Sequence, residues 1–534
     1  MRKVISMLLV VLLLGAVAIP AFAANGCTCA YTPIIYVHGQ QAIYKFNEDG
    51  TKTEFGSDDD EQVSAAIKEM IPIFAKTLVS QDWDAYADAF YDKFAPLFDC
   101  ITYDEDGNVP ANTGIEWSWT PQSIPASHSY HNCLYTYEYD YRLAPLDVAD
   151  DLHAYIEAVK AKTGHDHIIL ASRCGGTNLV AAYIYKYEMQ KQYADLDKVL
   201  FICGNLLGSD MAEAVMSGNI KINEEAAYRW VKNYDLTEYV GEQFGEYIYT
   251  TLDMLENVYG TAMVYKVVDD LYGKLKDNLL ARFLKKYHGI NAGLVTFVYE
   301  HYEEYKNYVF QEPGDLEKYK KLIDKFDDYH YNVQVKNNEI LQDMADHGVE
   351  VDTVAYYGDQ TYPLMESASL TSDRIASVED QGYGTVVSSL VGTLSDKYIA
   401  ERKALGFEKY ISPDKQVDAS TGLFPETTWY LKNGQHHFAA YGGVFDRMVC
   451  DLCRQKNITV NTDSRYPQFL NFDEKNEAII PAQEINGNDV DWASYDDDAQ
   501  NGLENFITMM RNLIQMIIEK GKDIIQGIIH IFKK

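Results

Sequence analysis

Short apolar runs alternate with stretches of helical periodicity along much of the chain. The apolar runs have the composition of buried parallel strands, and they occupy residues 33–37, 134–143, 167–171, 198–202 and 349–357. Apolar side chains three or four positions apart predict helices at residues 58–99, 148–162 and 178–187. Strands that alternate with helices in this way predict an α/β fold with a mostly parallel sheet flanked by helices.

The pattern changes over residues 205–348, where a long Tyr- and Lys-rich helical stretch contains no strand-like run and a single proline, Pro313. Strand-like signals return after it, which favours one sheet domain made of residues 24–204 and 349–470, with residues 205–348 inserted as a helical lid or cap. A separate helical domain of unrelated purpose is the alternative.

The first residues have the three parts of a cleavable secretory signal. Arg2 and Lys3 precede an apolar run over residues 5–18, and the small-residue triplet that ends at Ala23 follows. The run is shorter than the roughly 20 residues that a membrane-spanning helix needs. The sequence therefore predicts a signal peptide over residues 1–23 and a secreted, extracellular protein.

The C-terminal part combines an acidic linker with an amphipathic helix. Residues 471–502 are predicted to be the linker, and residues 471–500 within it hold nine acids and one lysine. Over residues 503–534, apolar side chains recur on one helical face, and residues 505–534 carry five basic and two acidic residues. Two interpretations stay open for this helix: contact with a membrane surface, or docking onto the protein's own core or a second copy.

Charge and cysteine content narrow the function classes. The 534 residues include 80 Asp and Glu against 46 Lys and Arg, a net charge of −34, and removal of Arg2 and Lys3 with the signal gives −36. A chain this acidic repels phosphate backbones, so nucleic acid is not an expected partner. No histidine lies close to Cys450-x-x-Cys453 or Cys27-x-Cys29 in the sequence, which favours disulfides or thiols over zinc at these pairs.

Residues 170–177, Leu-Ala-Ser-Arg-Cys-Gly-Gly-Thr, join a predicted strand to a predicted helix. A tight strand-to-helix turn can present a nucleophile at a helix N-terminus, and it requires small residues two positions before and after that nucleophile. With Cys174 at the turn, Ser172 and Gly176 meet this requirement, and the helix N-terminus and Arg173 favour the thiolate. With Arg173 at the turn, the site has no nucleophile. We favour the first register.

The chain resembles the α/β-hydrolases, and within them the lipases related to lecithin:cholesterol acyltransferase. Three motifs carry most of the resemblance, in the family's order: Pro-Ile-Ile-Tyr-Val-His-Gly ending at Gly39, Tyr-Asp-Tyr-Arg-Leu-Ala-Pro ending at Pro145, and the turn at 172–176. The segment 200–208 is similar to the strand and loop that lead into the family's lid. The resemblance implies an α/β-hydrolase fold with a large helical lid.

The resemblance also implies site residues. Cys174 takes the position where most relatives have serine, and the amide N–H groups of Gly175 and Gln40 would form the oxyanion hole. The segment that begins at Trp429 is similar to the one that ends in the family's catalytic histidine, and we choose His436 over His437 as the base.

The triad acid departs from the family pattern. Relatives often carry Asp-Gly-Thr-Val, whereas this chain has Tyr383 where that aspartate would lie. Asp380 is the replacement candidate, with Asp373 and Asp359 as alternatives.

These assignments predict a secreted esterase, lipase or acyltransferase that acts on an ester or lipid-like substrate and needs no metal or other cofactor. The alternative is a catalytically inactive hydrolase-fold protein that binds lipid, membrane or a surface partner.

Overall fold

The computed structural model describes most of residues 29–482. The described part excludes residues 1–28, 30, 40, 56–65, 67–68, 71, 74–75, 78–79, 126–132, 224–225, 228–271, 288–298, 366–370, 389–391, 434–442 and 483–534. The predicted signal peptide, the predicted amphipathic helix and most of the predicted acidic linker therefore lie outside the described residues.

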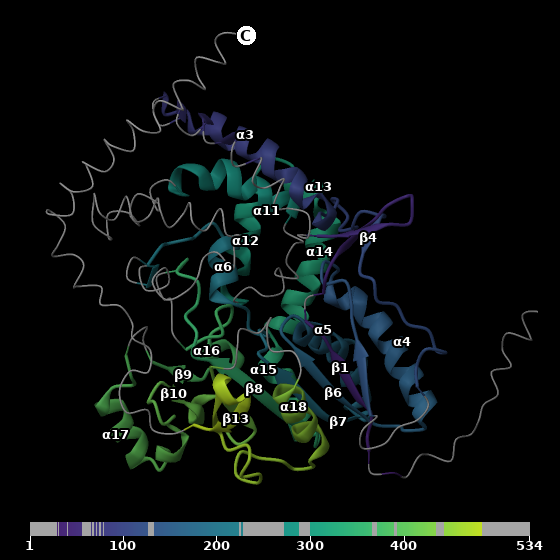
Figure 1. The fold of residues 1–534 in the computed structure, drawn as a ribbon, viewed down its shortest axis with the longest axis vertical. Coiled ribbons are helices and arrows are strands. Elements are labelled where there is room, and N and C mark those ends of the chain that lie inside the picture. The colour runs from purple at the N-terminus through teal and green to yellow at the C-terminus, as the bar shows by residue number, and fades with distance from the viewer. Residues whose placement is uncertain are drawn as a thin grey trace, which may run out of the picture.

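A central eight-stranded sheet organises the molecule (Figure 1). Its strand order is β13-β12-β11-β8-β7-β6-β1-β5, and all neighbours pair in parallel except β12 and β13. The strands are β1 (Ile34–Val37), β5 (Leu134–Tyr137), β6 (Ile168–Arg173), β7 (Leu196–Ile202), β8 (Glu350–Tyr357), β11 (Thr428–Lys432), β12 (Phe469–Asp473) and β13 (Ala478–Pro481). The predicted α/β fold with a mostly parallel sheet is confirmed.

Successive strand residues point to opposite faces of this sheet, and apolar side chains occur on both faces. Helices cover each of the two faces. Leu170 of β6 and Phe201 of β7 belong to the core under α4 (Pro145–Thr163), α5 (Gly176–Tyr183) and α15 (Asn337–Asp346). The other face packs against α18 (Val444–Arg454). Strands buried on both faces read as continuous apolar runs, which is why the sequence revealed them.

The sequence patterns did not predict the buried central strand β11, nor several short strands outside the central sheet. A small antiparallel sheet joins β2 (Tyr44–Phe46), β3 (Lys52–Glu54) and β4 (Thr113–Gly114), and β9 (Val386–Val387) pairs with β10 (Val417–Asp418). The central sheet also continues to Pro481, so the first part of the predicted linker at 471–502 is an edge of the sheet. The predicted strand 134–143 is shorter, because the chain leaves the sheet after Tyr137.

The insertion at 205–348 contains helices and no strand within its described residues. These helices are α6 (Asp210–Met216), α11 (Ala281–Tyr287), α12 (Tyr302–Val309), α13 (Asp315–Lys318), α14 (Lys320–Tyr329) and α15. Tyr305, Val309 and Phe326 belong to a separate apolar cluster formed by the insertion itself. None of the described helices is long and apolar enough to cross a membrane.

A helix from the N-terminal part joins the insertion (Figure 1). α3 (Trp83–Phe94) packs beside α11, where Arg282 pairs with Asp88 and the ring of Phe283 contacts the ring of Tyr91. The remaining helices are α16 (Val378–Gln381) and α17 (Asp396–Ala404). Short 3₁₀ and π segments are η1 (Ala95–Ile101), η2 (Ile184–Glu188), η3 (Met189–Lys191), η4 (Lys276–Leu280), η7 (Tyr299–His301), η8 (His330–Gln334), η9 (Glu408–Tyr410), η10 (Ala419–Thr421) and η11 (Glu474–Asn476).

A buried lysine joins two strands and a helix near the amino ends of the strands. Lys198 of β7 is 2% exposed, and its Nζ lies 3.0 Å from both the Asp352 and the Glu350 carboxylates of β8. The same ammonium donates to the carbonyl oxygens of Leu452 and Gln455 at 2.9 and 2.8 Å. Burial raises the pKa of Asp352 to about 7, and the attraction of Lys198 opposes that rise.

Replacing this lysine should destabilise the fold strongly. Lys198→Met leaves two carboxylates without their cation inside the protein, so we expect the free energy of unfolding to fall by roughly 3–5 kcal/mol at neutral pH. Lys397→Met is the matched control, because the Lys397 side chain is 87% exposed, and we expect a change within about 0.5 kcal/mol. Urea denaturation of both variants measures the difference, and equal effects would contradict the role of Lys198.

Candidate functional site

The strand-to-helix turn after β6 has Cys174 at its apex. Arg173 is the last residue of β6, Gly175 is the N-cap residue of α5, and Cys174 between them has φ +51°. A non-glycine residue in this region of backbone space costs about 1–3 kcal/mol, and it persists only where the surrounding structure holds it there. Of the two registers considered from the sequence, the described backbone has the one with the cysteine at the turn.

Hydrogen bonds from both sides fix this strained turn. The Cys174 amide donates to the carbonyl oxygen of Ile202 on the neighbouring strand at 3.1 Å. The carbonyl oxygen of Cys174 accepts from the Thr177 amide at 3.0 Å and from the Thr177 hydroxyl at 2.6 Å. The backbone that carries the half-buried Cys174 thiol is therefore fixed by hydrogen bonds at Cys174 itself and at Thr177, one turn later.

The loop after β1 lies directly against this turn. A Cβ added to Gly176 would overlap the carbonyl oxygen of His38 and lie 2.7 Å from that of Val37. A Cβ added to Gly39 would lie 3.0 Å from the Cys174 Cβ and 3.6 Å from its Sγ. The contacts at Gly176 require glycine, the contact at Gly39 is tight, and together they bring the start of the predicted oxyanion loop beside the thiol.

The predicted oxyanion donors can be assessed only in part. Gly175 has helical backbone angles, and within the described residues its N–H donates to no backbone carbonyl. An amide at this position, ahead of the first helical turn, is one of the N–H groups that a helix leaves unsatisfied. Gln40, the second predicted donor, lies outside the described residues.

Tyr139 is a neighbour of the turn to which sequence reasoning gave no role. A Cβ built on Gly175 would lie 3.4 Å from the Tyr139 Oη, and this buried hydroxyl finds no hydrogen-bond partner within the described residues. Burial, followed by the charge of Cys174, raises the pKa of the Tyr139 phenol, so it stays protonated at neutral pH. It is therefore a neutral donor available beside the thiol.

The helical insertion reaches the same place through Tyr329, at the end of α14. Its hydroxyl donates to the Asn178 Oδ1 in α5 at 3.2 Å, and both residues are buried. The Asn178 side-chain amide in turn contacts the Asn205 Oδ1 at 3.4 Å, just after β7. A polar chain thus joins the insertion, the helix after Cys174 and the loop after the next strand.

A second thiol follows β7 at the same edge. Cys203 is buried and has φ +38°. Burial raises the pKa of the Cys203 thiol, Arg173 lowers it, and Asp373 and Cys174 raise it further. The ends of neighbouring parallel strands meet at one edge of a sheet, so position after a predicted strand was the signal that could have brought Cys203 into the candidate site.

Asp380, the acid chosen from the sequence, lies in α16 in an environment that favours its neutral form. Its Oδ2 accepts from the Ser377 hydroxyl at 2.9 Å, and the carboxyl is 8% exposed. Burial, and then the charges of Asp210 and Glu379, raise its pKa well above the usual value. A neutral carboxyl group is a poor partner for an imidazolium ion, because charge stabilisation is what the triad acid supplies.

Asp373 and Asp359, the alternative acids, lie together beyond the carboxyl end of β8, where isolated bridges connect their backbones. Asp373 is buried, and its Oδ1 accepts from the amides of Ile375 and Ala376 at 3.1 and 2.9 Å. Asp359 pairs with Arg374 at 3.6 Å. Of the three candidate acids, Asp373 is the one whose charge acts on Cys203 beside the turn.

The predicted base, His436, and its neighbour His437 lie outside the described residues. Asn433, the last described residue before them, packs closely against Gly358, one residue before Asp359. His38 is a described histidine near the turn. Burial and then Arg173 lower its pKa, so it is neutral at neutral pH.

The comparisons with known proteins leave the function open. No family model matches the chain, and no curated protein sequence matches it significantly. Among solved structures, the crystal structure of the Tle4–Tli4 complex matches with a TM-score of 0.23 and 11% identity, over 61% of this chain and 75% of that chain. The described residues define an α/β protein with a cysteine-bearing strand–turn–helix at the carboxyl edge of its sheet.

Closing the space at Gly176 should disrupt the candidate site. In Gly176→Ala the new methyl group meets two backbone carbonyl oxygens, which cannot move aside cheaply, so we expect a loss of at least about 1–3 kcal/mol of stability. Gly273→Ala is the control, since a Cβ there meets no atom of the described residues within 4 Å, and its helical position predicts a gain of up to about 1 kcal/mol. Thermal unfolding compares the two, and a neutral Gly176→Ala would contradict the close approach.

Proposed function

We propose that the chain is a cysteine-dependent α/β-hydrolase that cleaves or transfers the acyl group of an ester or lipid-like substrate. The observation that carries this proposal is the turn at Cys174: a nucleophilic side chain on a positive-φ residue between a central strand and a buried helix. The order of the parallel strands, with β1 and β6 adjacent and the helical insertion after β7, supports it.

In the proposed reaction, the Cys174 sulfur attacks the carbonyl carbon while His436 accepts the thiol proton. The oxyanion that forms accepts hydrogen bonds from the amides of Gly175 and Gln40. The carbon–oxygen ester bond then breaks, and the alcohol leaves with the proton from His436. Water or an acceptor alcohol cleaves the resulting thioester, returning a proton to Cys174. Tyr139 is placed to donate a further hydrogen bond at this centre.

We assign the acid of the proposed triad to Asp373 in place of Asp380. Asp373 lies next to Asp359, beyond the end of β8. Asn433 contacts the same region through Gly358, and Asn433 is three residues before His436 in the sequence. Asp380 instead lies among Ser377, Asp210 and Glu379.

Removal of the thiol should abolish turnover. We expect Cys174→Ala to lower the hydrolysis of short-chain acyl esters at least about 1,000-fold, whereas Cys29→Ala, which changes an exposed cysteine, leaves the rate unchanged. We also expect iodoacetamide to label Cys174 faster than it labels cysteine in solution, because the turn presents the thiol at the N-terminus of α5.

A wild-type protein without esterase activity, whose Cys174 reacts no faster than cysteine in solution, would overturn the proposed chemistry. That outcome would favour a non-catalytic protein that binds a lipid or a surface partner. Tyr383, buried where relatives often have the triad aspartate, is the observation that supports this second candidate function.

The two aspartates can be separated by matched substitutions. We expect Asp373→Asn to lower kcat roughly 100- to 10,000-fold with little effect on folding, because Asn keeps the Oδ1 that accepts from Ile375 and Ala376.

We expect Asp380→Asn to keep kcat. Because the folded-state pKa of Asp380 is raised, its stabilising contribution is present below about pH 4 and is lost as pH rises.

Asp380→Asn should accordingly raise the melting temperature at pH 7 and change it little below about pH 4. Steady-state kinetics at pH 7 and thermal unfolding across pH measure both effects. A large loss of kcat in Asp380→Asn with an unchanged Asp373→Asn would reverse the assignment.

A further inference from the structure

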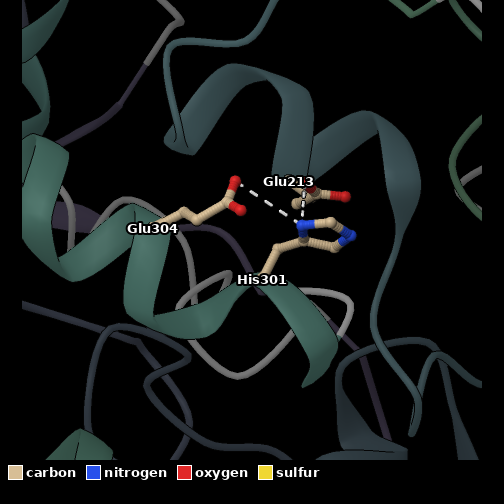
Figure 2. A group of neighbouring side chains, drawn as sticks. All are labelled: Glu213, His301 and Glu304. Carbon is tan, nitrogen blue, oxygen red and sulfur yellow. Dashed lines mark ion pairs between the residues drawn. The ribbon is translucent and has the colours of Figure 1, made fainter.

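Three potential metal ligands converge within the helical insertion, in a cluster apart from the residues assigned to the proposed reaction. The His301 Nδ1 lies 3.7 Å from the Glu213 Oε1 and 3.5 Å from the Glu304 Oε2 (Figure 2). One ligand atom from each residue lies within 4.8 Å of the others, and no other such group of His, Cys, Asp and Glu occurs among the described residues. Figure 2 shows both carboxylates directed toward the same side of the imidazole ring.

The ligands come from two segments that are distant in sequence. Glu213 is in the first turn of α6, and Ser209 is the N-cap residue of this helix. His301 is the N-cap residue of α12, and Glu304 lies three positions later, so both can face α6. The Asn219 side-chain amide contacts the Glu304 Oε2 at 3.5 Å. A hydrogen bond of this type to a ligating carboxylate is common around metal sites.

The surroundings add unbalanced negative charge. Asp210 is half-buried, and its carboxylate has no hydrogen-bond or ion-pair partner within the described residues. A cation bound among these carboxylates would offset their mutual repulsion.

We propose that Glu213, His301 and Glu304 bind one divalent transition-metal cation, with Zn²⁺ as the expected ion. Imidazole nitrogen and carboxylate oxygen are both zinc ligands, and three protein ligands leave the fourth tetrahedral position to water. Ca²⁺ and Mg²⁺ favour sites made entirely of oxygen ligands, which the histidine disfavours. The cation would join α6 to α12 and so connect the start of the insertion to its helical cluster.

Titration of the protein with Zn²⁺, measured by isothermal titration calorimetry, tests the site. We expect one saturable site that raises the melting temperature, and His301→Gln or Glu304→Gln should weaken binding by roughly 100-fold or more. Both side chains are more than one third exposed, so neither substitution should prevent folding. His347→Gln is the matched control, because among the described residues His347 pairs with one carboxylate, that of Asp343, at 3.4 Å.

Co²⁺ absorption distinguishes this site from binding to cysteine. A site with nitrogen and oxygen ligands gives visible d–d bands without thiolate-to-cobalt charge transfer, and these bands should disappear in His301→Gln and persist in His347→Gln. Binding of equal strength in both variants, charge-transfer bands from thiolate ligands, or a preference for Ca²⁺ over Zn²⁺ would each overturn the proposal. None of these measurements depends on esterase activity, so the failure of one proposal leaves the other standing.

Discussion

The close approach of Gly176 to the carbonyl oxygens of Val37 and His38 is the constraint around which the candidate site is built. It seats the first turn of α5 on the end of β1, and a side chain at position 176 would hold these segments apart. Because of it, the loop after β1 passes Cys174 so closely that a Cβ at position 39 would lie 3.0 Å from the Cys174 Cβ. The strained backbone at Cys174 is then determined by its neighbours on two strands and one helix.

The two ends of the sheet are organised by different chemistry. Near the amino ends, the Lys198 ammonium lies 3.0 Å from two carboxylates and donates to two carbonyl groups, so it joins β7 to β8 and α18 in the interior. Near the carboxyl ends, polar groups with fewer partners collect, including the Tyr139 hydroxyl and the Gly175 amide. A protein with this division has a structural end and an end where polar groups remain available to a ligand.

Sequence patterns predicted the parts of this structure that depend on local burial. The central strands β1, β6, β7 and β8 are apolar on both faces, and the turn at Cys174 is marked by the small residues around it. The end of β12 and all of β13 were predicted to be acidic linker, and β13 is an edge strand, which buries less and tolerates charge. Spacing alone also could not show that Asp380 lies among other acids, since tertiary packing brings Asp210 to it.

The cluster of Glu213, His301 and Glu304 was missed for the same reason. Its members are separated by most of the insertion, and Glu residues are abundant throughout the chain. Pairs spaced three apart, such as Asp210 with Glu213 and His301 with Glu304, are the signal in the sequence that could have suggested it. That signal becomes specific only when two such pairs face each other.

The insertion also has a consequence for how the chain folds. β1, β5, β6 and β7 are neighbours in the sheet and lie within residues 34–202, so their contacts can form early and without the rest of the chain. The next pairing, between β7 and β8, closes a loop that contains residues 203–349, and closure of a longer loop has a larger entropic cost. Contacts of such long range slow folding. The half of the sheet that carries Cys174 is therefore expected to assemble first, with one edge exposed until β8 arrives to cover it.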